Sequence, residues 1–586
     1  MAVFLSGLVG IVVFYVLVLA VGIWAGTKQK NNGEEEVLLA GRSLGFSVGV
    51  LTLIATWVGG GYINGTAEAF FRDGLLWCQV PIGYSLSLIF GSFLFVKPMR
   101  EANYVTMLDP FQQKYGQRVG GLLFFPALFG DVFWIASILA SLGSSLRVIL
   151  DINSTVSIII STIFAAAYTV VGGLYSVTYT DVLQIFCIII GLILCTPFAY
   201  YQEPFTKGSS EVEHWLGHVQ HKDFGIWIDG LLLLIFGGIP WQGYFQRVLS
   251  IKSTYIAQTM GIAAMFGCIA MAVPAAAVGL IAKSVDWTNV PDFNRNITVD
   301  DASIIMPLVF KYMTPTWVSF FGLGAVSAAV MSSADSSILA SSAMFSRNIY
   351  KLTFRPKASE EEVLCVLRIA IVVIALMAAV IALNVDSIYY LSYLCSDLVY
   401  VVLFPQLLLV VHWPGGVTTY GCLAAYIVGL ALRILGGEQG VGIPAIIHYP
   451  WFDEEKQIQR FPFRTLAMLS AMLAHVVVSC LARWLFQAGI LYADRWDVLY
   501  DFPECHFQRI DHSREPRAKE GATKCRSNKA VRDAMVGKRM SQSSADGDGS
   551  LINHDDQQSA VSVKRDRSSI TYQTSTTSDE PSICIS

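Results

Sequence analysis

The sequence predicts an all-α protein that crosses a membrane about thirteen times, with two of its spans interrupted. Of the 586 residues, 54% are hydrophobic and only 14% are charged. In a soluble protein of this length roughly a quarter of all residues are charged, so the composition indicates a polytopic membrane protein. The formal net charge of −4 adds little, because most charges lie in the connections and in the C-terminal part.

The predicted spans follow one another along most of the chain. Each is an apolar stretch of a length that crosses the hydrocarbon core of a bilayer. We place them at residues 5–26, 44–70, 76–98, 120–149, 155–173, 178–201, 225–248, 257–283, 315–347, 362–384, 388–411, 417–436 and 463–487. The first stretch lacks a basic flank and a small-residue cleavage site, so we expect a true span and not a signal peptide.

Lys and Arg gather in alternate connections, which predicts the orientation of the chain. These clusters lie near residues 28–42, 97–118, 247–252 and 347–357. Cytoplasmic connections carry an excess of Lys and Arg, so we expect the N-terminus outside and the C-terminus in the cytosol. Two glycosylation sequons, at Asn153 and Asn296, fall on the expected outer side. Asn296 lies in the roomier loop and is the expected glycosylation site.

The second span contains a break at Gly59-Gly60-Gly61. Each glycine costs roughly 1 kcal/mol relative to alanine in a helix, so three in a row predict that the helix unwinds. Unwound backbone at membrane depth is tolerated only within protein or around a cavity, and broken helices mark the binding sites of secondary transporters. Trp57 and Tyr62 flank the break. The first interpretation is a sodium-coupled carrier with an aromatic-lined substrate site.

A second break lies in the seventh span, at residues 237–240, directly before Trp241. Pro240 lacks the N–H group that a continuous helix needs. Five predicted spans separate the start of one broken helix from the start of the next, and an odd number makes the two five-span units run in opposite directions. Paired breaks at matching positions of inverted halves indicate a central transport site. A pair of ordinary kinks is the alternative.

The repeats set the expected division of the chain. Residues 1–43 form the first span and a cytoplasmic loop, 44–202 the first repeat, 225–411 the second repeat, 412–490 two peripheral spans and 491–586 a cytoplasmic tail. The tail is rich in Ser, Thr and charged residues, so we expect it to be disordered. Short basic–serine patterns at Ser541 and Ser568 are candidate kinase sites, and we expect trafficking or kinase partners there, although such patterns also arise by chance.

The ninth span carries adjacent hydroxyls at Ser332 and Ser333, one turn after Ala329. Small hard cations prefer oxygen ligands. These two hydroxyls, with the carbonyls of Ala329 and of Ala55 and Val58 at the first break, predict a five-oxygen sodium site. The alternative is that the serines pack tightly or bond back to their own backbone.

Carboxylates within spans are costly and are usually functional. Asp181 and Asp335, together with Ser336, are candidates for a second cation site or an inner gate. The other acidic candidates, for gating, proton or structural roles, are Asp397, Asp131 and Glu68. A structural role at a helix end is the alternative for each of them.

Aromatic residues at mid-membrane depth predict the class of substrate. They are Trp57, Tyr62, Tyr84, Trp134 and Trp241. A quaternary ammonium group forms no strong hydrogen bonds and is held by aromatic faces, each worth up to about 2 kcal/mol when desolvated. A sugar site would instead need Asn, Gln and charged groups around the break. The alternative for each ring is packing or a place in the interfacial belt.

The remaining features argue against other classes of protein. The eleven cysteines are scattered singly, without metal-ligand spacing. No nucleophile–base pair or metal motif is present, so we expect no enzyme, no organic cofactor and no nucleic-acid partner. A ligand-gated channel or a sensor that does not transport is the alternative from another class.

The chain resembles the sodium/solute symporter family over roughly residues 5–490. The features shared across that family are the serine run before Arg347 and the segment from Gly172-Gly173 to Asp181. Longer blocks resemble the choline-carrying members, and these lie at residues 55–69, 81–85, 104–113 and 237–242.

The resemblance implies a thirteen-span, LeuT-like inverted-repeat fold and choline uptake that depends on sodium and chloride. It also implies residence in the plasma membrane of presynaptic terminals and in synaptic vesicles, where choline supplies acetylcholine synthesis. By motif position Trp57, Tyr84, Trp134 and Trp241 match the choline cage, and Ala55, Val58, Ala329, Ser332 and Ser333 match the shared sodium site. Asp335 departs from a hydroxyl that some relatives use for a second sodium ion, and no residue is assigned to chloride. A symporter of another small organic solute is the alternative.

Overall fold

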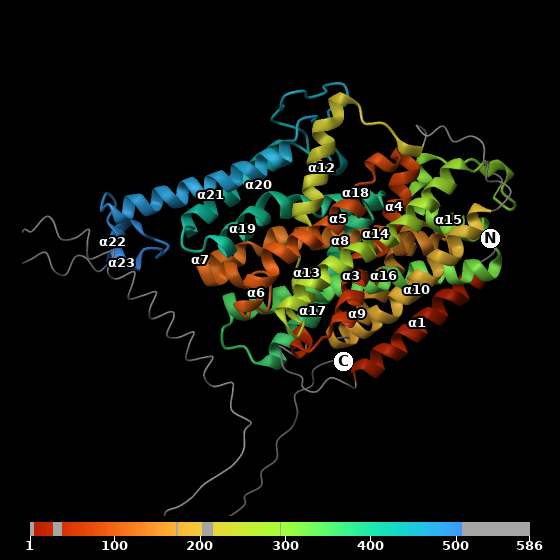
Figure 1. Ribbon diagram of the computed structural model, residues 1–586, viewed down its shortest axis with the longest axis horizontal. Helices are drawn as coiled ribbons and strands as arrows, with labels where there is room; N and C mark the ends of the chain where they lie inside the picture. The colour runs from red at the N-terminus through yellow and green to blue at the C-terminus, as the bar shows by residue number, and fades with distance from the viewer. Residues whose placement is uncertain (1–4, 27–37, 172–173, 202–214, 294, 507–586) are drawn as a thin grey trace, which may run out of the picture. The chain divides into compact units, whose positions relative to one another are not determined.

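The computed structural model describes residues 5–26, 38–171, 174–201, 215–293 and 295–506, which form a bundle of helices (Figure 1). Within this part of the chain, ten helices are long and apolar enough to cross a membrane, and the bent pair α3–α4 makes an eleventh. Two shorter apolar helices, Ser154–Ala167 and Thr419–Leu435, occupy the places of the two remaining predicted spans. Every predicted span is therefore helical. The predicted tail beyond residue 506, the basic residues at 28–30 and Gly172-Gly173 lie outside the described residues.

The first helices run from α1 to α10. Their bounds are α1 Leu5–Gly26, α3 Phe46–Trp57, α4 Gly60–Asp73, α5 Val80–Gly91, α6 Lys97–Glu101, α7 Asp109–Leu122, α8 Phe124–Leu150, α9 Ser154–Val171 and α10 Leu174–Tyr200. A π-helical turn, η3 (Ser92–Val96), joins α5 to α6 so that they form one span. Five spans, from α3–α4 to α10, lie within the residues predicted to form the first repeat.

The second set runs from α12 to α19. Its bounds are α12 Phe224–Gly237, α13 Gln242–Leu249, α14 Thr254–Ser284, α15 Ile305–Tyr312, α16 Thr316–Met344, α17 Glu360–Ala382, α18 Ile388–Leu394 and α19 Phe404–His412. Two π-helical segments, η7 (Phe345–Phe354) and η8 (Val399–Leu403), extend α16 and join α18 to α19. The chain continues through α20 Thr419–Leu435, α21 Phe463–Gln487, α22 Ala493–Trp496 and α23 Pro503–His506. The expectation of disorder is wrong for residues 491–506, because they contain two short helices and Asp501 accepts hydrogen bonds from the Thr419 amide and hydroxyl.

Both predicted breaks are present. α3 and α4 meet at an angle of 50°, and Gly59 between them is extended, with φ −93° and ψ −175°. α12 ends at Gly237, and the chain resumes helical geometry at Gln242 after an extended Trp241 with φ −117° and ψ 129°. The proline and glycine signals in the sequence therefore located the two interruptions.

The glycines of the first break serve close packing more than unwinding. Only Gly59 leaves the helix, whereas Gly60 and Gly61 begin α4. A Cβ on Gly59 would lie 1.9 Å from Ser333 Oγ, and one on Gly61 would lie 2.4 Å from Ser137 Oγ. The run of three glycines thus lets α16 and α8 approach the broken helix, which the unwinding argument did not predict.

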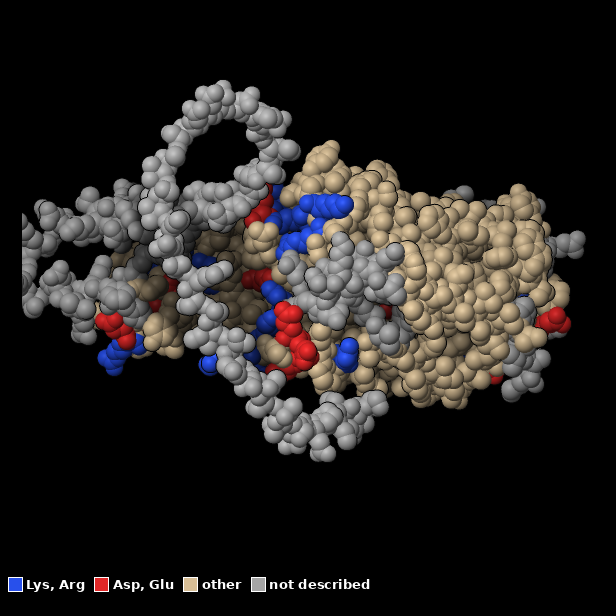
Figure 2. Space-filling view, turned by 90° about the horizontal axis from the view of Figure 1, so that it is seen from below, with Lys and Arg blue, Asp and Glu red and all other residues tan. Residues whose placement is uncertain are grey.

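The centre of the bundle is α16, which is buried along nearly its whole length and packs against α1, α8 and α10. The outside is apolar, with exposed Val16 on α1, Leu376 on α17 and Leu473 on α21. Figure 2 shows a face on which uncharged side chains form a broad surface and charged side chains gather in a limited zone. Such an apolar exterior is compatible with a lipid bilayer. The polar residues buried inside the bundle are therefore candidates for the functional site.

Candidate functional site

A cavity lies where the two helix breaks meet α5, α8 and α16. Its walls carry residues from both breaks and from these three helices: Thr56, Trp57, Tyr84, Asp131, Trp134, Trp241, Gly243, Ser337 and Ala340. Four of the five aromatic residues proposed for the substrate cage are thus brought together. Because the lining comes from both repeats, rocking of one repeat against the other would change the access to this cavity.

The aromatic walls stand at steep angles to one another. The ring centroids of Tyr84 and Trp134 are 5.8 Å apart with an interplanar angle of 84°, and those of Trp134 and Trp241 are 6.1 Å apart at 70°. Trp57 packs edge-on against Tyr244 at 6.0 Å. Edge-to-face pairs of this kind point ring faces in different directions around one volume, which is the arrangement that a cationic group needs.

Hydrogen bonds at the polar ends hold two of these rings in place. The Tyr84 hydroxyl donates to the carbonyl of Ser392 at 2.7 Å and lies 2.7 Å from Ser396 Oγ. The Trp241 indole N–H donates to the carbonyl of Gly237 at 2.8 Å, across the second break. The interrupted backbone therefore supplies the acceptor that orients the ring beside it.

Tyr62 is not part of the cavity wall. It lies in the first turns of α4, wholly buried, and its hydroxyl donates to the carbonyl of Cys268 on α14 at 2.9 Å. Its closeness to the break in the sequence predicted a place in the cage, but the helix has resumed by this residue and turns the ring toward α14. Asp131, Ser337 and Thr56 line the cavity instead, and of these only Asp131, which lies three residues before Trp134, shared a helix face with a predicted cage residue.

A cluster of buried oxygens lies between the first break and α16. Ser332 Oγ lies 3.2 Å from the carbonyl oxygen of Ala55, and Ser333 Oγ lies 3.3 Å from the same atom and 3.4 Å from the carbonyl oxygen of Thr56. The Ala329 carbonyl oxygen lies 3.8 Å from the position of a Cβ on Gly59, and Ser333 Oγ lies 1.9 Å from that position. These oxygens are of the type that a sodium ion prefers.

The other member of the predicted sodium set, Val58, occupies the turn where the helix ends. Its backbone has φ −83° and ψ 61°, outside the helical region. Thr56, which the sequence analysis did not include, supplies a carbonyl to the cluster. The broken helix therefore presents the carbonyls of Ala55 and Thr56 toward the two serines.

The predicted second-cation or gate residues surround a buried arginine. Arg247, at the end of α13, is wholly buried, and its Nη2 lies 3.4 Å from Asp181 Oδ2 and 2.6 Å from Ser336 Oγ. Asp181 also accepts hydrogen bonds from Ser332 Oγ at 2.8 Å and Thr52 Oγ1 at 2.5 Å. The sequence predicts Arg247 in a connection between spans, but it lies within the helical span His221–Leu249.

Asp335 lies beside this cluster, wholly buried, and one of its oxygens accepts a hydrogen bond from the Ser336 amide at 2.7 Å. The guanidinium of Arg247 joins the second broken helix to α10 and α16. It also places a fixed positive charge beside Asp181 and Ser336, the residues for which the sequence suggested either a second cation site or an inner gate. The Asp181–Arg247 pair is one hydrogen bond from the oxygen cluster, through Ser332.

Glu68 has a structural position. Its carboxylate accepts hydrogen bonds from Ser387 Oγ at 2.5 Å and from the amides of Ile388 and Tyr389 at 3.0 and 3.2 Å. These amides begin α18, so the carboxylate caps the start of that helix. Of the three roles left open for Glu68, the structure favours the structural one.

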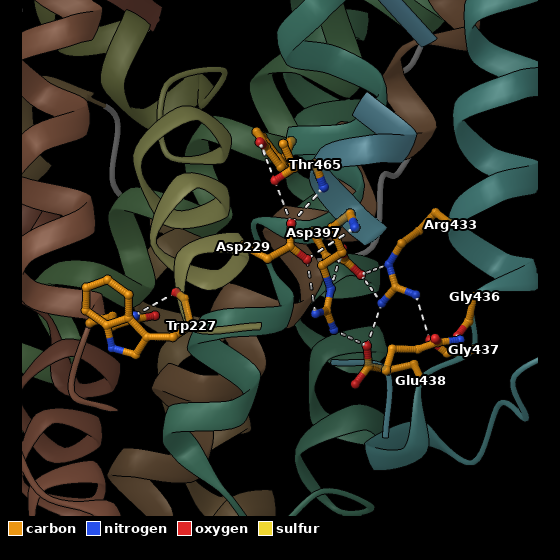
Figure 3. A network of polar contacts seen from close by, with 12 residues as sticks. Trp227, Asp229, Asp397, Arg433, Gly436, Gly437, Glu438 and Thr465 are labelled. Atoms are coloured by element: carbon orange, nitrogen blue, oxygen red, sulfur yellow. Dashed lines mark hydrogen bonds and ion pairs between the residues drawn. The ribbon is translucent and has the colours of Figure 1, made fainter. Parts of the chain in front are cut away.

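Asp397 belongs to a network of charged residues away from the cavity (Figure 3). Arg433 donates to Asp397 Oδ2 at 2.5 Å and to Glu438 Oε2 at 2.6 Å. Arg464 donates to Glu438 at 2.6 Å, and its Nε lies 3.4 Å from Asp397 Oδ1. Burial alone would raise the pKa of Glu438, but the positive charges of Arg464 and Arg433 outweigh it and lower that pKa to about 2.

The same network reaches the second broken helix. Asp229 on α12 accepts hydrogen bonds from the Thr465 amide and hydroxyl at 2.7 and 2.6 Å and from the Arg464 amide at 3.2 Å. Thus α12, which leads into the second break, is fastened to the start of α21.

Of the two glycosylation sequons, Asn296 is exposed, whereas the Asn153 side chain caps α9 by accepting a hydrogen bond from the Val156 amide at 2.8 Å.

Two broken helices that meet at an aromatic cavity and a buried oxygen cluster define a secondary membrane transporter. The sequence profile of the sodium:solute symporter family matches residues 37–429. That match covers more than half of the chain, so the protein belongs to the sodium:solute symporter family. Its role is transport and not catalysis, as the sequence predicted.

Curated relatives are similar over most of the chain. The high-affinity choline transporter 1 of Drosophila melanogaster is 54% identical over 505 residues, which cover 86% of this chain and 81% of that protein. The high affinity choline transporter 1 of Homo sapiens is 50% identical over 511 residues, covering 84% of this chain and 87% of that protein.

A solved structure confirms the predicted fold class. The Na+-coupled sialic acid symporter in a substrate-bound outward-open state superposes with a TM-score of 0.65 at 16% identity. The match covers 81% of this chain and 98% of that one. At this identity the likeness concerns the fold alone, which is the LeuT-like fold of sodium symporters.

Proposed function

We propose that the protein carries choline into the cell together with sodium, by alternating access. The observation that carries this proposal is the cavity in which Trp57, Tyr84, Trp134 and Trp241 converge between the two helix breaks. Aromatic faces in a desolvated site bind a quaternary ammonium group, which hydrogen-bonding side chains do not hold. The curated relatives at 54% and 50% identity carry the name of choline transporters, in agreement with this chemistry.

In the proposed cycle, sodium binds among the oxygens of Ala55, Val58, Ala329, Ser332 and Ser333. Sodium there would replace the contacts of the Ser332 and Ser333 hydroxyls with the Ala55 carbonyl and so fix the end of α3. Trp57 follows Ala55 by two residues, so the ion orders one wall of the choline cavity. This shared segment couples the two sites.

The inner cluster serves as a gate in this proposal. Arg247 holds α13 to α10 and α16 through Asp181 and Ser336, and release of these contacts would let the second broken helix move. Because Ser332 hydrogen-bonds Asp181, sodium binding and the gate share one residue. The guanidinium charge argues against a second metal ion beside Asp181 and Asp335.

The driving force comes from two cations that move inward. The sodium gradient and a negative interior both favour this direction, and the potential alone is worth about 2.3 kcal/mol per charge per 100 mV. We further propose an outside N-terminus, a cytoplasmic C-terminus with trafficking or kinase partners, glycosylation at Asn296, and chloride dependence. The proposed location is the presynaptic plasma membrane and synaptic vesicles, where choline supplies acetylcholine synthesis.

Radiolabelled choline uptake into cells that express the protein tests the proposal, with sodium replaced by an inert cation as the blank. We expect sodium-dependent accumulation of radiolabelled choline. Unlabelled choline should inhibit this accumulation, whereas proline and sugars should not. Trp57→Ala should abolish it at normal surface expression, because the ring forms a wall of the cavity. Trp451→Ala is the matched control, since Trp451 is 70% exposed in the loop between α20 and α21. Normal uptake by Trp57→Ala would contradict the aromatic cage.

A further inference from the structure

One acidic side chain lines the aromatic cavity. Asp131 lies on α8 three residues before Trp134, and both side chains reach the same cavity. Its side chain is buried, with 5% exposed, and one carboxylate oxygen accepts a hydrogen bond from the Ser341 hydroxyl on α16. The rest of the lining is aromatic, small or hydroxyl-bearing. Asp131 is therefore the one formal charge in the wall of this cavity.

The carboxylate of Asp131 is not neutralised within the described part of the chain. Two other buried carboxylates there have an arginine within reach: Asp181 lies 3.4 Å from Arg247, and Asp229 lies 3.9 Å from Arg464. No Lys, Arg or His of the described residues forms an ion pair with Asp131. A buried charge without a partner is strongly unfavourable, and in membrane proteins such a residue marks a path for ions or substrate.

We propose that Asp131 is the counter-ion of the transported ammonium group. In the occupied cavity its carboxylate faces the positive end of the substrate, while the rings of Trp57, Tyr84, Trp134 and Trp241 enclose the methyl groups. This inference rests on the proposed function for the identity of the substrate. It assigns to Asp131 the selection of a permanent cation over an uncharged molecule of the same shape.

The physical reason is that aromatic walls discriminate charge only in part. A ring face attracts an ammonium group, but it also buries an uncharged tert-butyl group of the same size through the hydrophobic effect. A full negative charge in a water-poor cavity adds an attraction that the uncharged molecule lacks. Burial of the Asp131 carboxylate without a positive partner is unfavourable, and entry of the cation removes that penalty.

Inhibition of sodium-dependent choline uptake by two compounds tests the proposal. Tetramethylammonium carries the charge without the hydroxyl group of choline, and dimethylbutanol is the uncharged carbon isostere of choline. In the wild type we expect tetramethylammonium to inhibit at least about tenfold more strongly than dimethylbutanol, a difference of about 1.4 kcal/mol. Equal inhibition by the two compounds would overturn the counter-ion role, and this arm needs no variant.

The isosteric variant Asp131→Asn removes the charge. We expect the KM for choline and the inhibitory concentration of tetramethylammonium to rise together by about tenfold or more, with inhibition by dimethylbutanol unchanged. A rise for choline alone would show that the carboxylate accepts the choline hydroxyl and would overturn the counter-ion role. No rise for either cation would overturn it as well.

Two further variants separate charge from packing. Asp131→Glu keeps the charge and should preserve the preference for tetramethylammonium over dimethylbutanol even if Asp131→Asn fails to reach the cell surface. Ser341→Ala removes the hydrogen-bond donor and should also preserve this preference. Loss of the preference in both variants would indicate that cavity shape, and not charge, sets it. Absence of sodium-dependent choline uptake in the wild type would instead refute the proposed function.

Discussion

Asp131 in the aromatic cavity and Asp397 in the network of Figure 3 are both buried carboxylates, and they differ in what surrounds them. Asp397 contacts the guanidinium groups of Arg433 and Arg464. Asp131 receives one hydrogen bond from a serine. The network satisfies the charge of Asp397 within the chain, whereas the cavity that we propose to bind a cation leaves the charge of Asp131 for the ligand. The comparison separates structural from functional acids by their partners and not by their burial.

The network also explains how the second break is supported. It joins α12, the segment that contains Asp397 between α18 and η8, and the helices α20 and α21. Trp241 lies in the break that follows α12, so the position of one cavity wall depends on charges that do not contact the substrate. The peripheral helices α20 and α21 thereby contribute to the site through its scaffold.

The largest expected effect is the loss of stability on removal of an arginine from the network. Arg464→Met leaves Glu438, Asp397 and Asp229 with excess negative charge in a buried place, and breaking such a cluster typically costs about 3–5 kcal/mol. We expect a lower melting temperature of the purified protein and less protein at the cell surface. Thermal unfolding in detergent measures the first and surface biotinylation the second.

Two variants make this prediction specific. Arg483 lies on the same helix as Arg464 and is partly exposed. Arg483→Met should therefore change the melting temperature only as little as an ordinary surface substitution does. Asp131→Asn should keep or raise the melting temperature, because it removes a buried charge that has no partner. If Arg464→Met and Asp131→Asn lowered it equally, the contrast between the two regions would be wrong.

The second prediction concerns acid. The folded pKa of Glu438, about 2, lies below its ordinary value of 4.5, so the charged form stabilises the fold above pH 4.5. This contribution, about 3 kcal/mol in order of magnitude, is lost as the pH falls from 4.5 toward 2. Between pH 6 and 8 Glu438 should add no pH dependence.

Melting temperatures of the wild type and of Glu438→Gln over this pH range test the assignment. The wild type should lose its advantage over the variant as the pH falls below 4.5. Parallel curves for the two proteins would mean that the carboxylate of Glu438 contributes no pH-dependent stability, and the network would then be weaker than its geometry implies.

The sequence located features that depend on local pattern. Glycine and proline runs predicted both breaks, and the adjacent serines predicted the hydroxyls that lie 3.2 and 3.3 Å from the Ala55 carbonyl. Four of the five proposed cage rings line one cavity because each lies on or near the middle of a span. These signals are confined to a few neighbouring residues, so one sequence is enough to read them.

Other features depend on distant partners. Arg247 follows an apolar stretch at the end of a span, as cytoplasmic arginines do, and only the fold shows Asp181 and Ser336 beside it. The Thr465 amide and its acceptor Asp229 lie 236 residues apart, a pairing that no local pattern predicts. Tyr62 is close to the break in the sequence but does not line the cavity, because α4 has already begun at this residue and its hydroxyl bonds to the distant Cys268 carbonyl.

The smallest predicted effect tests whether the two regions are coupled. Tyr84 borders the cavity, and its hydroxyl bonds to the Ser392 carbonyl and lies 2.7 Å from Ser396 Oγ, one residue before Asp397. Tyr84→Phe keeps the ring and loses these contacts, which should cost about 1 kcal/mol and raise the choline KM by about fivefold.

Combination of Tyr84→Phe with Arg464→Met then gives a double-mutant cycle. Both side chains hold the same segment, from Ser392 to Asp397, so we expect their effects on unfolding free energy to depart from additivity by at least about 0.5 kcal/mol. The matched pair Tyr84→Phe with Arg483→Met should be additive. Additive losses in the first pair would mean that the network supports the fold without influencing the cavity, and the choline KM of Arg464→Met should then equal that of the wild type.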